Sequence, residues 1–131
     1  MNYIKSNNLI GWLTFSIAFI VYYLTIEPTV SFWDCGEYIS TAYKLEVGHP
    51  PGAPLFQLLG RFFSLFANDV TNVAFMINLM SALCSAFTIL FLFWTITGIA
   101  RRLVNEQVDD NFTHITVLVA GLWCARICIY R

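Results

Sequence analysis

The sequence predicts an all-α integral membrane protein, with two complete transmembrane helices, a truncated third one, and short interfacial helices in the first extracytoplasmic loop. Composition is the first reason, since 58% of the 131 residues are apolar and only 11% are charged. A soluble domain has about half apolar and about a quarter charged residues. The second reason is that two apolar segments are long enough to cross a bilayer, with turn-forming residues between them.

The first span is predicted over residues 9–26, an almost continuous apolar segment. Trp12 near one end and Tyr22 near the other suit the aromatic belts at the two surfaces of a bilayer. A cleaved signal peptide is the alternative, but no small-residue cleavage site precedes Glu27. We therefore expect an uncleaved helix.

Residues 27–72 form the predicted extracytoplasmic loop. A short helix can begin at Asp34, and the prolines and glycines of residues 48–54 end it. Residues 55–67 have helical periodicity, with a wide apolar face and one narrow polar stripe. The stripe consists of Gln57, Gly60, Arg61, Ser64 and Asn68. A helix of that length is too short to span, so we expect it to lie at the interface or against other helices.

The second span is predicted over residues 73–100, and a cytoplasmic turn over 101–111 follows it. The third apolar segment, residues 112–131, is predicted to be a partial span. Arg126 lies within it, where a lone arginine costs about 2.5–3.5 kcal/mol on insertion scales. We therefore expect this segment to be truncated, with an altered reading frame near its end as one explanation.

Basic residues determine the predicted orientation. Lys5 and the Arg101–Arg102 pair flank the two spans, whereas residues 27–72 carry five acidic residues and only two basic ones. The positive-inside rule then places the N-terminus in the cytoplasm and residues 27–72 outside it. The net charge of −1 excludes a bulk attraction to nucleic acid, so nucleic acid is not expected as a partner. Membrane lipids are expected as partners because two apolar segments are long enough to cross a bilayer.

The four cysteines lack the spacing of a zinc site, and we predict no metal site, cofactor or disulfide framework. Cys84, Cys124 and Cys128 lie in apolar segments, where we expect small buried hydrophobic residues. Cys35 stands alone in the polar loop.

Asp34 and Glu37 are the candidate catalytic residues. Their spacing places both carboxylates on one helix face, where one can act as a general base towards a hydroxyl and the other can orient the acceptor or tune the first. The same spacing is typical of a capping box, with Asp34 as N-cap. The two interpretations are compatible, and spacing alone leaves both open.

Four further residues are candidates for substrate binding. His49 can bind a phosphate or an acceptor, or it can simply order a turn, and Pro50 after it makes the backbone rigid. Lys44 and Arg61 are the loop's two cations. A guanidinium matches a lipid phosphate bidentately, although an arginine at an interface often only extends to the headgroups.

Two motifs in this loop resemble a known family. They are TVSFWDCGEY at residues 29–38 and VGHPPGAPL at residues 47–55, with Lys44-Leu45 between them. Together they closely resemble the start of a large bacterial multi-pass family of unknown function, whose animal relative is a transmembrane protein O-mannosyltransferase. More distantly, they are similar to the protein O-mannosyltransferases and other glycosyltransferases of the C-type fold.

The resemblance implies the N-terminal portion of an inverting glycosyltransferase in a bacterial inner membrane. The implied substrates are a polyprenyl-phosphate-linked sugar donor and a hydroxyl on a translocated protein acceptor. Asp34 would be the base, Glu37 its partner, and His49 part of the donor or acceptor pocket. Family members have many more spans, so this chain is expected to be an inactive fragment on its own. The alternative is a non-catalytic membrane scaffold or transport-related subunit, in which the two acids only start a helix.

Overall fold

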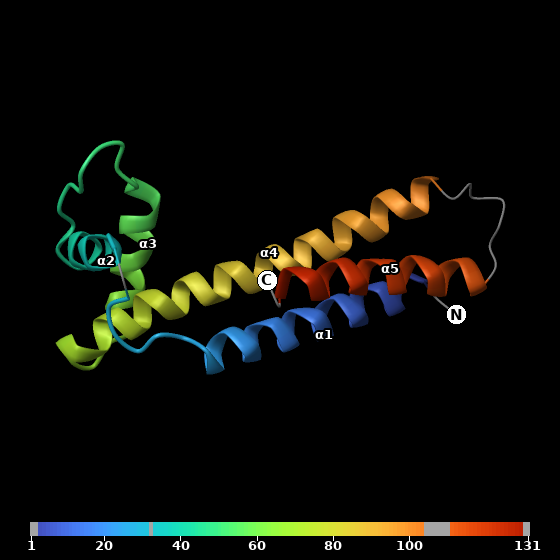
Figure 1. Ribbon diagram of the computed structural model, residues 1–131, viewed down its shortest axis with the longest axis horizontal. Coiled ribbons are helices and arrows are strands. Elements are labelled where there is room, and N and C mark those ends of the chain that lie inside the picture. The colour runs from blue at the N-terminus through green and yellow to red at the C-terminus, as the bar shows by residue number, and fades with distance from the viewer. Residues whose placement is uncertain (1–2, 32, 104–110, 130–131) are drawn as a thin grey trace. The chain divides into compact units, whose positions relative to one another are not determined.

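The computed structural model describes residues 3–31, 33–103 and 111–129, and these residues form helices and connecting loops without strands (Figure 1). The predicted all-α class is therefore confirmed for this part of the chain. In order, the elements are α1 (Tyr3–Leu24), α2 (Cys35–Lys44), α3 (Pro54–Ser64), the 3-10 turn η1 (Val70–Asn72), α4 (Val73–Leu103) and α5 (Asn111–Ile129).

The long helices differ from the predicted spans at their ends. The prediction of 9–26 followed hydropathy, but α1 begins at Tyr3, because polar residues are compatible with the first turns of a helix. α4 continues to Leu103, so Arg101 and Arg102 belong to the helix and not to a turn. Positive charge in the last turn suits the helix dipole. Most of the predicted turn lies outside the described residues.

Among the described residues, two helical stretches are long and apolar enough to cross a membrane: α1 and Val70–Leu103, which contains α4. This agreement concerns length and composition. Insertion, orientation and the truncated third span remain predictions.

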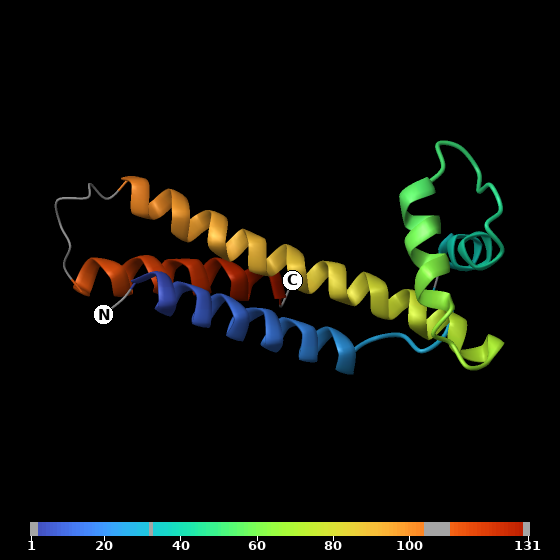
Figure 2. The ribbon, with the colours of Figure 1, turned by 180° about the vertical axis from the view of Figure 1, so that it is seen from behind.

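The chain divides into two compact units (Figures 1 and 2). We call Met1–Tyr22 with Cys84–Arg131 the helical unit and Tyr23–Leu83 the loop unit. The helical unit contains α1, α5 and the later part of α4. The loop unit contains α2, α3, η1 and the beginning of α4.

Glycines allow close helix packing in the helical unit. A Cβ at Gly121 of α5 would lie 2.8 Å from Thr97 Cγ2 and 2.9 Å from Phe93 Cε2, both on α4. A Cβ at Gly11 of α1 would lie 2.5 Å from Trp94 Nε1. Small residues at such positions are how apolar helices approach one another without large side chains between them. Phe93 and Thr97 are accordingly fully buried.

In the loop unit, α2 and α3 pack against the beginning of α4. The buried core consists of Ile39, Ala42, Val73, Ile77 and Met80. At the α2–α3 contact, a Cβ at Gly60 would lie 2.9 Å from the Ala42 Cβ, so only glycine fits there without a shift.

The two faces of α3 are used in an unexpected way. The predicted polar stripe is the packed side, because Gly60 and Ser64 are buried. Much of the apolar face is exposed, and Leu55 and Leu58 are 70% and 62% exposed, whereas Phe56 and Phe63 pack against the core. Hydropathy identified two faces but not which one turns inward, since the small residues of the stripe permit closer packing than leucine or phenylalanine would.

The expectation of buried cysteines is wrong for Cys84, which is exposed on α4. An apolar helix packs only part of its circumference, so an apolar neighbourhood in the sequence does not bury every residue. The side chains of Cys124 and Cys128 lie outside the described residues.

Candidate functional site

Asp34 immediately precedes α2, but its carboxylate does not cap the helix. Its backbone carbonyl accepts a hydrogen bond from the Tyr38 N–H at 3.0 Å, whereas its side chain makes no capping hydrogen bond. A capping residue usually has extended dihedral angles, and Asp34 has φ −74° and ψ 2°. The capping-box interpretation is therefore wrong, and the Asp34 carboxylate is exposed and not engaged by the backbone of α2.

Glu37 pairs with His49 instead. Its Oε1 accepts the His49 backbone N–H at 2.9 Å, and its Oε2 lies 2.7 Å from His49 Nδ1. Both carboxylate oxygens of Glu37 thus contact His49, which lies in the 45–53 loop, twelve positions after Glu37. A turn closed by the Gly52 N–H on the His49 carbonyl at 3.0 Å follows directly. Gly52 has φ +76°, which favours glycine.

This pairing changes the titration of both groups. The backbone hydrogen bond from His49, followed by that from its ring, lowers the pKa of Glu37. The hydrogen bond and the negative charge of Glu37 raise the pKa of His49, and the charge of Asp34 adds a smaller contribution in the same direction. Asp34 therefore acts electrostatically on His49. With Nδ1 facing Glu37, the opposite ring nitrogen, Nε2, is the one left for a ligand.

Gly48 and Gln57 belong to the same polar cluster, and sequence reasoning assigned neither a role. A Cβ at Gly48 would lie 3.4 Å from Glu37 Oε1 and 3.5 Å from Gln57 Nε2. These are ordinary contact distances, so Gly48 lies beside both α2 and α3. The signal for Gln57 was its place on the polar stripe of α3, which faces inward.

The two loop cations lie elsewhere. Arg61 Nη1 donates to the Tyr43 carbonyl at 2.7 Å, and its guanidinium lies 5.3 Å from the centre of the Tyr43 ring. It therefore joins α3 to the C-terminal end of α2. Lys44 Nζ lies 3.9 Å from Glu46 Oε1 in an exposed ion pair. The described contacts bring neither cation to Glu37 or His49. Pro50 is exposed beside His49 and is joined to Pro51 by a cis peptide bond.

A mostly apolar cleft of about 400 Å³ lies on another side of α2. Its lining residues are Cys35, Tyr38, Ile39, Ala53, Phe56, Ile77, Asn78 and Ser81. Asn78 Nδ2 donates to the carbonyls of Glu27 and Thr29 at 2.9 and 3.1 Å, which ties the start of the loop to α4. Glu37 does not line this cleft, so α2 separates an apolar cleft from the polar cluster.

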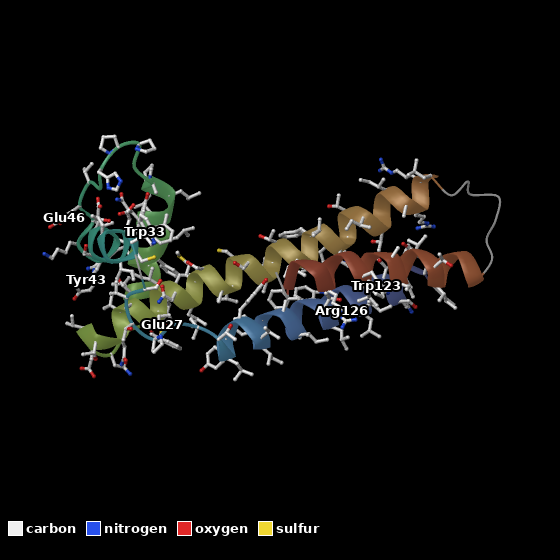
Figure 3. The ribbon with its side chains drawn as sticks, viewed as in Figure 1. Glu27, Trp33, Tyr43, Glu46, Trp123 and Arg126 are labelled. Carbon is white, nitrogen blue, oxygen red and sulfur yellow. The ribbon has the colours of Figure 1, made fainter. Side chains whose placement is uncertain are left out.

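Trp33 stands at the N-terminal end of α2, and Tyr43 and Glu46 stand at and just beyond its C-terminal end (Figure 3). The Trp33 side chain is 95% exposed, and its φ is 63°. Asp34 follows it directly, so an exposed indole and an exposed carboxylate are neighbours at this end of the helix.

The family model and two similar proteins that match this chain are described as protein O-mannosyl-transferases. Residues 34–130 match the family described as the protein O-mannosyl-transferase TMEM260 N-terminal domain. The chain is 38% identical over 85 residues to the Dictyostelium discoideum protein O-mannosyl-transferase tmem260, covering 64% of this chain and 10% of that protein. It is 37% identical over 83 residues to the Mus musculus protein O-mannosyl-transferase TMEM260, covering 63% and 12%.

The chain thus spans about a tenth of the length of these curated relatives. No solved structure matches it. The predicted relation to protein O-mannosyltransferases is confirmed, whereas the bacterial origin and the fragment status remain predictions. The family match contains every candidate site residue and continues through the third apolar segment.

Proposed function

Because this chain belongs to the family of the protein O-mannosyl-transferase TMEM260 N-terminal domain, we propose that it is the N-terminal part of a membrane glycosyltransferase of the protein O-mannosyl-transferase kind. The donor in this proposal is a polyprenyl-phosphate-linked sugar, and the acceptor is a hydroxyl of a translocated protein. One observation supports the proposal: the exposed Asp34 carboxylate makes no capping hydrogen bond and directly precedes the helix whose Glu37 holds His49.

In the proposed step, Asp34 accepts the proton of the acceptor hydroxyl. The acceptor oxygen forms a bond to the anomeric carbon of the sugar from the face opposite the phosphate. The bond between that carbon and the phosphate oxygen breaks, and its electron pair leaves with the polyprenyl phosphate. The configuration of the sugar is inverted. Because the phosphate is a good leaving group, orientation and charge stabilisation supply most of the catalysis.

Glu37 and His49 act as a unit in this proposal. The resemblance suggested Glu37 as the partner of Asp34, but its carboxylate is occupied by His49. The raised pKa of His49 favours the imidazolium, whose Nε2–H can donate to a phosphate oxygen of the donor. Glu37 is thus a positioning residue, and Asp34 keeps the role of base.

The remaining candidates have supporting roles. Pro50 limits the backbone freedom of His49. Lys44 is exposed and can attract the anionic donor, and Arg61 can add a phosphate contact while it holds α2 and α3 together. In this proposal α1 and α4 cross the membrane, with residues 27–72 on the extracytoplasmic side. For a bacterial protein that membrane is the inner one.

The deciding test is Asp34→Asn in the complete polypeptide. Transfer should fall by at least about 100-fold, the usual range for a lost general base, while membrane insertion and protein level stay unchanged. Asp34→Ser is the companion variant, because serine still caps a helix. A scaffold role for Asp34 predicts that serine is silent, whereas a base predicts the same loss as asparagine. Normal transfer by Asp34→Asn would end the proposal.

A further inference from the structure

Two residues other than glycine flank α2 with left-handed backbone conformations, and only one of them has a local reason. Leu45, with φ 57°, is the C-cap of α2, where its N–H and that of Glu46 both bond to the Thr41 carbonyl. This is a common way to end a helix. Trp33, with φ 63°, precedes the helix and takes part in no such motif among the described contacts.

Trp33 is unfavourable in its backbone and in its side chain. A left-handed conformation is unfavourable for a residue with a bulky side chain, and glycine would avoid that cost. Burial of the indole does not compensate, because the side chain is 95% exposed and makes no ring contact with described residues. Local violations of this kind are expected at functional sites.

The position of Trp33 beside Asp34 indicates the function. An acceptor oxygen that gives its proton to Asp34 must lie within about 3 Å of that carboxylate, and the sugar must lie next to that oxygen. The Cα atoms of Trp33 and Asp34 are about 3.8 Å apart, as in any trans-linked pair. A sugar that reacts at Asp34 is therefore within reach of the indole.

We propose that the Trp33 indole is a platform for the sugar ring of the donor, an inference that rests on the proposed function. A hexose has faces formed by C–H groups, which pack against the electron-rich face of an aromatic ring. The indole N–H can additionally donate to a sugar hydroxyl. Trp33 thus determines affinity for the sugar, whereas the contacts proposed for His49 concern the phosphate.

The test compares two lipids with the complete polypeptide in phosphatidylcholine nanodiscs: a short-chain polyprenyl phosphate mannose and the same polyprenyl phosphate without sugar. Trp33→Gly removes the indole and suits the left-handed backbone, so it should fold. We expect it to weaken binding of the mannose-bearing lipid about tenfold, the loss of one aromatic contact, and to leave binding of the bare lipid unchanged. Trp33→Phe, which keeps a smaller aromatic face, should lie between wild type and Trp33→Gly.

Each other outcome overturns a specific claim. If wild type prefers the mannose-bearing lipid and Trp33→Gly keeps that preference, the platform is wrong and the proposed function stands. If wild type binds both lipids equally, the proposed donor is wrong and the platform with it. If Trp33→Gly weakens both lipids equally, the platform is wrong. Trp33 is then a membrane anchor if brominated acyl chains quench more tryptophan fluorescence in wild type than in Trp33→Gly.

Discussion

The helical unit and the loop unit differ in how far their polar side chains reach along the sequence. Hydroxyls bond locally in both units, and in the loop unit Thr41 donates to the Glu37 carbonyl at 2.8 Å. In the helical unit, threonine hydroxyls mostly bond back to their own helix, as Thr14 does to the Ile10 carbonyl and Thr95 to the Phe91 carbonyl. In the loop unit, charged and amide side chains reach across 12 to 51 residues of sequence. Those contacts are Glu37 to His49, Arg61 to Tyr43 and Asn78 to Glu27.

The difference indicates which unit holds polar groups in fixed positions for a binding or catalytic site. An apolar helix satisfies its hydroxyl donors locally, which costs little in any environment. Long-range contacts instead hold the groups of a site in fixed positions. A hydroxyl exception in the helical unit is Tyr3, which donates to the Thr97 carbonyl.

After Asp34→Asn, the largest expected effect in the loop unit comes from Glu37→Gln. The amide keeps one acceptor oxygen but loses the second acceptor and the negative charge that hold His49. Misplacing a catalytic group by about 1 Å can cost about 100-fold in rate. Transfer by the complete polypeptide should therefore fall by about that factor. Glu46→Gln is the matched control, since Glu46 pairs only with exposed Lys44 among the described contacts, and its activity should stay near wild type. Equal losses in both variants would mean that only net charge matters.

Alanine substitutions at two glycines, one tightly packed and one with open space around it, should change stability differently. Gly60→Ala places a Cβ 2.9 Å from the Ala42 Cβ, so α2 and α3 must shift, at a cost of about 1–3 kcal/mol. Gly98→Ala on α4 meets nothing within 4 Å and should be neutral or stabilise by up to about 1 kcal/mol. Thermal unfolding in detergent measures both variants. A destabilised Gly98→Ala variant would show that α4 packs differently.

A matched pair of polar deletions tests whether long-range polar contacts contribute more stability than local ones. Asn78→Ala removes two long-range hydrogen bonds and should cost about 1–3 kcal/mol. Thr95→Val removes one hydroxyl that bonds its own helix and should change stability by less than about 0.5 kcal/mol. The same unfolding experiment compares them. If the two variants lose similar stability, the distinction between local and long-range contacts fails.

The smallest expected effect is the pH dependence of the loop, because water screens the partly exposed Glu37 and His49. The lowered pKa of Glu37 gives stability that is present above its ordinary value of 4.5 and is lost as pH falls through the lowered value. The raised pKa of His49 gives stability that is full below its ordinary value of 6.5 and is lost as pH rises through the raised value. The pair should therefore be strongest between pH 4.5 and 6.5.

An NMR titration of the His49 ring checks this expectation. Its midpoint should lie above 6.5 in wild type and move down in Glu37→Gln. A wild-type midpoint below 6.5 would mean that the pair does not form.

Much of the site was predictable because its residues are close in sequence. Asp34 directly precedes α2, Glu37 lies in its first turn, and His49 follows in the loop after α2, so their nearness follows from short-range geometry. The capping interpretation failed because it depended on the dihedral angles of one residue, Asp34, which spacing does not reveal. Trp33 was assigned no role for the same reason. Its left-handed φ cannot be read from the sequence, because only a glycine at that position would have suggested it.

By itself, the sequence determined the all-α class, the two long apolar helices and the motifs that carry the family resemblance, because hydropathy, helical period and turn residues act over a few neighbouring positions. Only the tertiary structure decided which groups meet. Glu37 holds His49 and leaves Asp34 free, α3 packs through its polar stripe, and Arg61 binds the end of α2. The path of the 45–53 loop and the fit of Gly60 against Ala42 decide these contacts, and no local pattern specifies either.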